Sequence, residues 1–345
     1  MKLKKEFSDF INLITIDSET NTLIEKRKTL QADIEENLPG ILENHGISLN
    51  KSDIRIIDQG SYKYKTTIKS DVVDRDVAVI IPLDTFQNDD PRKIKSYLKD
   101  AIDIPSRTLT VKEPCIRSSY HENGKEWLHI DLPLYAEDGS KFYLARGKAT
   151  SNNYSWQEAD PDGLNDDLCK KINGHDQLRR IIRFVKKWRN IKYSEAANDH
   201  SVPPSIGITY LVCDHFSEQT TSEGDYDLLA LQKTMCSIKN AFSCTKNEKG
   251  EVISADIKRL LPVAPYTDVF QKMRESGSNN MLNFYKRLSK AVEDLTNAVN
   301  VESEHDAGEY VQKVLGSEFV VPLKEASIAS TNSKREHSFG DKNDH

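Results

Sequence analysis

The segment that decides the fold spans residues 53–83 and reads DIRIIDQGSYKYKTTIKSDVVDRDVAVIIPL. Two β-rich runs, 53–58 and 74–83, flank a glycine-serine pair and a polar connection, and runs bounded in this way are typical of strands. Further β-rich runs lie at 109–118, 126–135 and 141–145, and a helical pattern lies near 91–102. We therefore expect an α/β (α+β) core in which a helix crosses a sheet.

Acidic residues distinguish two of these runs. Asp74 and Asp76 are two residues apart, so on a strand their side chains point to the same face, about 7 Å from each other. A third acid, Asp131, lies in the apolar run LHIDLPL, where a carboxylate needs a partner. Three carboxylates from neighbouring strands are the oxygen ligands that Mg²⁺ prefers, and they leave positions open for phosphate oxygens.

The glycine-serine pair, Gly60 and Ser61, is separated from Asp74 by twelve residues. A glycine lets the backbone approach a phosphate closely, and a serine donates N–H and O–H groups to phosphate oxygens. The pair is therefore a candidate phosphate-binding turn.

The order of these residues resembles the signature of polymerase-β-like nucleotidyltransferases: Gly-Ser, a short spacer, D-x-D and a lone Asp on a later strand. QGSYKYKTTIK and HIDLPLY resemble the phosphate-binding turn and third-aspartate strand of the cGAS/DncV-like nucleotidyltransferases (CD-NTases) of bacterial CBASS antiphage systems. RRIIRFVKKWRN, PPSIGITYLV and LLPVAPYTDVF resemble the helical domain that this family shares with oligoadenylate synthases. The resemblance covers roughly residues 50–300. It implies a nucleotidyltransferase core with a mixed sheet, followed by a helical lobe.

The resemblance also implies roles for individual residues. The positions that match the family's metal ligands and catalytic acids are Asp74, Asp76 and Asp131, and those that match its nucleotide-binding residues are Gly60, Ser61, Lys186 and Ser205. Lys187 is the alternative to Lys186 if the helix register shifts by one residue. The chain departs from the family pattern at Arg75, Lys65 and Ile206, where relatives usually have an apolar residue, a glycine and an aromatic residue.

The function that the resemblance implies is synthesis of a cyclic di- or trinucleotide second messenger from NTPs, with two Mg²⁺ ions for which Mn²⁺ can substitute. The implied partners are an effector protein that the product activates and an accessory protein that conjugates the C-terminus. Two alternatives stay open: nucleotidyl transfer to RNA or protein, and a non-catalytic nucleotide-binding module. The presence of all three acids argues against the non-catalytic module.

The second half of the chain has a different pattern. After Asp160-Pro161 the apolar residues recur at helical spacing, as in the stripe Leu178, Ile181, Ile182, Val185 and Trp188. We predict a nucleotidyltransferase core with N-terminal helices over 1–160, a helical lobe over 161–323 and a disordered tail over 324–345, because the tail has no periodic apolar face.

Charge and composition limit the possible partners. The 345 residues include 48 Lys+Arg and 54 Asp+Glu, a formal charge of −6, so we expect no activation by double-stranded nucleic acid. A local basic cluster at 170–192 is the exception, and it is a candidate phosphate contact. Because no apolar run approaches the roughly 18 residues of a membrane helix, we expect a cytoplasmic protein without a membrane partner. Five cysteines without a CxxC pair indicate reduced thiols.

Overall fold

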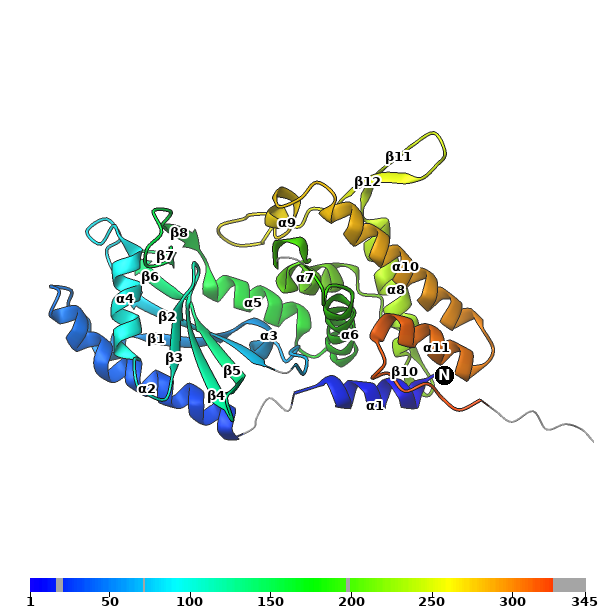
Figure 1. Ribbon diagram of the computed structural model, residues 1–345, viewed down its shortest axis with the longest axis horizontal. Coiled ribbons are helices and arrows are strands. Elements are labelled where there is room, and N and C mark those ends of the chain that lie inside the picture. The colour runs from blue at the N-terminus through cyan, green and yellow to red at the C-terminus, as the bar shows by residue number, and fades with distance from the viewer. Residues whose placement is uncertain (17–20, 71, 197–198, 325–345) are drawn as a thin grey trace, which may run out of the picture.

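The computed structural model describes residues 1–16, 21–70, 72–196 and 199–324. The described chain forms two lobes, one built on a sheet and one built of helices (Figure 1). The predicted tail, 324–345, lies outside the described residues except for its first residue. Among the helices described, none combines the length and the apolar character needed to cross a bilayer.

The sheet of the first lobe is mixed, as expected. Its eight strands within the described chain are β1 (Arg55–Gln59), β2 (Val73–Pro82), β3 (Thr108–Val111), β4 (Ile116–Glu122), β5 (Lys125–Leu132), β6 (Leu134–Asp138), β7 (Lys141–Arg146) and β8 (Ser155–Ala159). β2 pairs antiparallel with β1 and parallel with both β5 and β6, which follow one another along its other edge. β4 continues outward from β5 to β3, and β7 continues outward from β6 to β8.

The alternation of side chains along β2 gives the two faces of the sheet different partners. Val77, Val79 and Ile81 point into a core that includes apolar residues of α2 (Asn21–Glu43) and α4 (Pro91–Ala101). Asp74 and Asp76 lie on the opposite face, together with Ala78 and Ile80 further along the strand. The helices therefore cover one face of the sheet and leave the acidic face available for the second lobe.

The second lobe is a helix bundle, in agreement with the 3.6-residue periodicity of its sequence. Its main helices are α5 (Pro161–Ile172), α6 (Asp176–Lys192), α7 (Ser205–His215), α8 (Asp227–Asn240), α10 (Asn280–Asn300) and α11 (Glu304–Leu315). The predicted stripe of α6 is buried, and Trp188 is wholly inaccessible in the core. A short helix, α9 (Gln271–Glu275), follows an irregular stretch and borders the region between the lobes.

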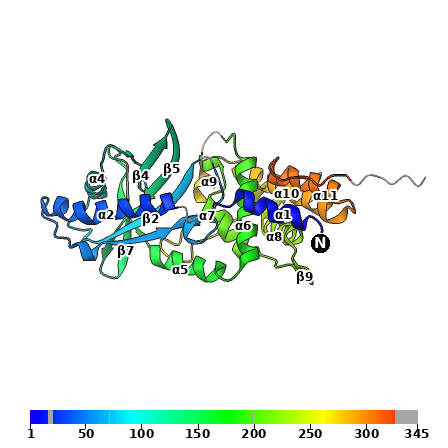
Figure 2. The same ribbon diagram turned by 90° about the horizontal axis from the view of Figure 1, so that it is seen from below.

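The first helix, α1 (Lys4–Ile14), contributes to the core of the helical lobe, not to the core of the sheet. Phe7 and Phe10 contact the rings of Phe184 in α6 and Phe319 near the end of the described chain. α1 runs along the bundle when the molecule is seen from below (Figure 2). The division at residue 160 stays a prediction, and α1 is a part of segment 1–160 that packs with the later segment.

Candidate active site

The three predicted acids lie together on the face of the sheet that α2 and α4 leave uncovered. β2 and β5 run parallel, and their register places Asp76 opposite Asp131 and Asp74 opposite His129. Each of the three acids offers a carboxylate oxygen, and these oxygens lie within 4.8 Å of one another. The alternation argument placed Asp74 and Asp76 on one face, and the strand pairing adds the third carboxylate.

The candidate phosphate-binding turn contacts the acids directly. Gly60 begins the short helix α3 (Gly60–Lys63) with a φ of +66°, and a Cβ at this position would lie 2.1 Å from Oδ2 of Asp76. Only glycine has neither the side chain that would clash nor the steric penalty for this backbone conformation. The hydroxyl of Ser61 is 3.1 Å from that of Thr67, so the two ends of the turn are tied together.

Two side chains that the sequence analysis did not select contact the acids. Arg117 of β4 lies opposite Asp131 and donates two hydrogen bonds of 2.7 Å to its carboxylate. His129 lies two residues before Asp131, hence on the same face, and its Nε2 is 2.9 Å from Oδ1 of Asp74. The two-residue spacing between His129 and Asp131 could have indicated that both side chains lie on one face of the strand. The contact of Arg117 could not be found in this way, because it depends on the pairing of two strands.

The electrostatic environment differs between the paired acids. Burial raises the pKa of Asp76 to about 7, and the charges of Asp74 and Asp131 add to this effect. Burial acts in the same direction on Asp74, but the hydrogen bond and charge of His129, together with the charges of Arg117 and Lys112, outweigh it, so the pKa of Asp74 lies below its ordinary value. Asp76 is therefore the acid whose charge is least compensated by neighbouring protein groups.

Arg75, the residue between the paired acids, points to the opposite face. Its guanidinium is buried and donates to Asp58 at 2.8 Å, and it lies 3.9 Å from the centre of the Tyr62 ring. The hydroxyl of Tyr64 donates to Asn165 at 2.6 Å. Both tyrosines therefore make packing contacts around the turn.

Lys186 of α6 lies behind the turn. It is 5% exposed, and its Nζ donates to the carbonyl and the hydroxyl of Thr66 at 3.3 and 3.1 Å. Burial lowers its pKa to about 7, and nearby arginines add to the effect. Arg183, one turn earlier in α6, donates to the carbonyls of Lys65 and Thr67. The two cations of α6 thus bind the backbone of the turn.

The other predicted helical-lobe residues are placed differently. Ser205 is the exposed first residue of α7. Lys187, the alternative to Lys186, pairs with Glu318, and Arg180 pairs with Asp225 and Asp227. Some cations of the predicted basic cluster therefore form ion pairs within the helical lobe. Lys65, at the position where relatives usually have glycine, adopts a φ of +55°.

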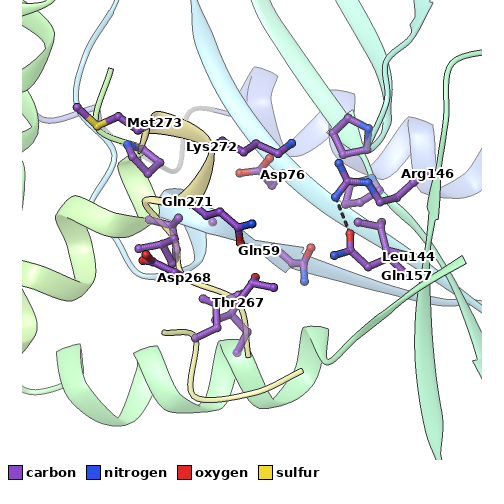
Figure 3. A pocket seen from close by; sticks show the side chains of 18 of the residues that line it. Gln59, Asp76, Leu144, Arg146, Gln157, Thr267, Asp268, Gln271, Lys272 and Met273 are labelled. Atoms are coloured by element: carbon purple, nitrogen blue, oxygen red, sulfur yellow. Dashed lines mark hydrogen bonds between the residues drawn. The ribbon is translucent and has the colours of Figure 1, made fainter. Parts of the chain in front are cut away.

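A cavity of about 760 Å³ lies between the lobes and reaches Gly60 and Asp76. Its sheet-side wall includes Gln59, Tyr135, Leu144, Arg146 and Gln157, and its helical-side wall includes Pro204, Ile206, Thr267, Gln271 and Lys272. Figure 3 draws the labelled side chains of the two walls facing a shared space. Ile206 lines the cavity as an aliphatic residue where relatives usually have an aromatic one. The volume is in the range of pockets that hold small molecules.

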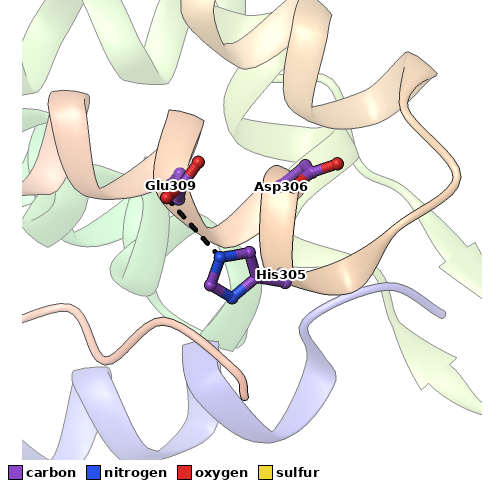
Figure 4. A group of neighbouring side chains, drawn as sticks. All are labelled: His305, Asp306 and Glu309. Carbon is purple, nitrogen blue, oxygen red and sulfur yellow. Dashed lines mark ion pairs between the residues drawn. The ribbon is translucent and has the colours of Figure 1, made fainter. Parts of the chain in front are cut away.

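A second group of potential metal ligands lies in α11, away from this cavity. His305, Asp306 and Glu309 offer ligand atoms within 4.8 Å of one another (Figure 4). The imidazole lies 2.7 Å from the carbonyl oxygen of Pro322 and 3.5 Å from Glu309. An ordinary helical ion pair four residues apart accounts for this arrangement.

Comparisons with known proteins agree with the sequence resemblance. Residues 54–135 match the family model described as cyclic GMP-AMP synthase DncV-like, nucleotidyltransferase domain, and the matched segment contains the turn and all three acids. A search of curated proteins by sequence finds no match.

Solved structures resemble this chain over most of its length. The crystal structure of Vibrio cholerae DncV cyclic AMP-GMP synthase, a prokaryotic cGAS homolog, has a TM-score of 0.66 at 16% identity, covering 92% of this chain and 97% of that one. Escherichia coli MS115-1 CdnC with ATP has a TM-score of 0.63 at 19% identity, covering 92% of this chain and 98% of that one. The same CdnC in complex with HORMA-deltaN gives the same TM-score and coverage. The predicted fold class and the resemblance to DncV-like nucleotidyltransferases are confirmed.

Proposed function

From a DncV-like fold whose segment 54–135 matches the nucleotidyltransferase domain of that family, we propose that this chain is a metal-dependent nucleotidyltransferase that makes a cyclic di- or trinucleotide from NTPs. The observation that carries the proposal is the contact between the turn and the acids. Gly60 approaches Asp76 so closely that a bound triphosphate and the three carboxylates would share one site.

The acidic cluster fits a divalent cation by its donor set and its charge. Asp74, Asp76 and Asp131 supply the oxygens that Mg²⁺ or Mn²⁺ takes. Burial, and then the negative charges of the other two acids, raise the pKa of Asp76, and a bound cation would offset those charges. These three residues would hold two ions. When bound, the ions would lower the pKa of an attacking ribose hydroxyl and neutralise charge on the phosphates.

The chain's own groups would position the nucleotide. The backbone N–H groups of Gly60 and Ser61 lie in the turn beside Asp76, and N–H groups of such turns donate to phosphate oxygens. Lys186 and Arg183 hold the turn from behind, and their positive charges lie on the side of the turn that faces α6. Arg117 and His129 orient Asp131 and Asp74. Ser205, at the start of α7, is the proposed contact from the helical lobe to the triphosphate.

We infer the biological setting by analogy with the relatives. CdnC is solved in complex with a HORMA protein, and DncV is solved with GTP analogues and with a linear dinucleotide intermediate. By analogy, the product of this chain would activate a separate effector in antiphage (CBASS) defence, with an accessory protein as a further partner. Because NTPs are present in the cytoplasm, we propose that the activity takes place there.

The test is incubation of the purified protein with four labelled NTPs and Mg²⁺ or Mn²⁺, followed by phosphatase treatment and mass spectrometry. A phosphatase-resistant product with the mass of a cyclic oligonucleotide is expected, and the Asp76→Asn protein should not form it. A labelled RNA or protein in place of that product would indicate nucleotidyl transfer to a macromolecule. Nucleotide binding without any product would indicate a non-catalytic module.

A further inference from the structure

The wall of the cavity opposite the helical lobe carries an arginine-glutamine pair, Arg146 in β7 and Gln157 in β8. Leu144 pairs with Gln157 across the strands, and Arg146 is two residues further along β7, so both polar side chains point to the same face. Tyr135 pairs with Leu144, and Ile80 pairs with Tyr135. These cross-strand pairings place Arg146 and Gln157 on the face of the sheet that carries Asp76.

The position of the pair suits the base of a nucleotide whose phosphates lie at the acids. Three strand spacings separate β2 from β8, which is roughly 14 Å at the backbone. The long side chains of Arg146 and Gln157 shorten that gap to one that a sugar and a base can fill. Both residues line the cavity that reaches Asp76, and Figure 3 shows their hydrogen bond within it.

The hydrogen bonds that Arg146 and Gln157 already make determine which of their donors and acceptors are left for a base. Arg146 donates through Nε and Nη2 to the carboxylate of Glu113, and through Nη1 to Oε1 of Gln157 at 2.5 Å. A guanidinium has five N–H groups and no acceptor, so further N–H groups remain on its two terminal nitrogens. The amide oxygen of Gln157 is occupied, and within the described chain its Nε2 donates to no residue. The polar groups of Arg146 and Gln157 that are left without a protein partner are therefore mainly hydrogen-bond donors.

Lys272 of α9 extends this donor surface from the other lobe. Its Nζ lies 3.9 Å from the Glu113 carboxylate that fixes Arg146, and it also lines the cavity. Lysine, like arginine, donates and cannot accept. A base that lies against this wall meets N–H groups from both lobes.

We propose that Arg146 and Gln157 select guanine over adenine at this site. The Hoogsteen edge of guanine presents two acceptors, N7 and O6, which arginine N–H groups match, whereas adenine presents one acceptor and an amino donor. The amino group of adenine would face donors and lose its hydrogen bonds to water without replacement. This inference rests on the proposed function, because it assumes that a nucleotide occupies the cavity.

The test compares Gln157→Glu with the wild type in equimolar GTP and ATP. A glutamate of the same shape replaces the free donor by an acceptor, so the ratio of guanine to adenine in the product should fall about tenfold. Glu158→Gln is the matched control, because Glu158 is the next residue of β8, exposed on the opposite face. Its base ratio should equal that of the wild type. Arg146→Gln should shift the ratio in the same direction as Gln157→Glu.

Two outcomes would overturn the inference: an unchanged base ratio in Gln157→Glu, or an equal loss of guanine and adenine incorporation. If the wild type forms no product from any NTP, the proposed function fails, and the wall is then tested by calorimetric binding of non-hydrolysable GTP and ATP analogues with Mg²⁺. Tighter binding of the guanine analogue, reduced about tenfold by Gln157→Glu, would support the wall. Equal affinities for the two analogues would refute it.

Discussion

Replacing Gly60 by alanine tests whether its contact with Asp76 governs activity. Gly60 has a φ of +66°, and the added Cβ would lie 2.1 Å from Oδ2 of Asp76 and 3.1 Å from Cγ. The left-handed backbone costs an alanine about 1–2 kcal/mol. The carboxylate must in addition move by about 1 Å to reach ordinary contact distance. A displacement of that size at a reacting centre lowers turnover on the order of 100-fold.

Gly46→Ala separates the two effects. Gly46 also has a positive φ, +78°, but a Cβ there would meet no atom within 4 Å. Gly46→Ala should lose about 1–2 kcal/mol of unfolding free energy in a urea titration, and Gly60→Ala should lose at least as much, because its Cβ also clashes with Asp76. Only Gly60→Ala should lose product formation in the labelled-NTP assay. If Gly60→Ala forms product at the rate of Gly46→Ala, the close approach of the turn to Asp76 does not matter for activity.

Three further predictions follow from the site. Burial raises the pKa of Asp76 to about 7 in the folded protein, above its unfolded value near 3.9. The stability that Asp76 contributes to the metal-free protein is therefore present below about pH 4 and is lost as the pH rises to about 7. Asp76→Asn should remove that decline and abolish product, and identical pH dependence in both proteins would contradict the assignment. Lys186→Met should weaken NTP binding about tenfold, and Lys187→Met should weaken it much less, because Lys187 is paired with Glu318. Calorimetry at fixed ionic strength measures both affinities, and equal losses would show that Lys186 has no special role. Double-stranded DNA or RNA should not stimulate synthesis by a chain of net charge −6, and a clear rise in rate with either polymer would refute this expectation.

Local patterns in the sequence were sufficient for the features that depend on neighbours along the chain. The two-residue spacing of Asp74 and Asp76 determines a shared face on any strand. The apolar run around Asp131 identifies a strand beside them. The apolar stripe of α6 gives its buried face without reference to other elements.

Features that depend on contacts between distant segments could not be predicted from local sequence patterns. Arg117 reaches Asp131 because β4 and β5 pair in one register, and a shift of that register by one residue would turn the side chain to the other face. The resemblance suggested that Lys186 contacts a triphosphate, but it could not indicate that Thr66 occupies its ammonium in this structure. Likewise, the sequence predicts N-terminal helices within 1–160, but it does not indicate that α1 joins the core of the helical lobe.

The packing of α1 has a consequence for the order in which the protein can fold as it leaves the ribosome. Phe7 and Phe10 are made roughly 300 residues before Phe319, which both rings contact. At about 5–20 residues per second, this apolar helix waits on the order of 15–60 s for its full core. The sheet-bearing lobe can complete its own core in that interval, whereas the bundle closes only when the end of the described chain arrives. Segments that are roughly 300 residues apart in the nascent chain therefore meet late in assembly.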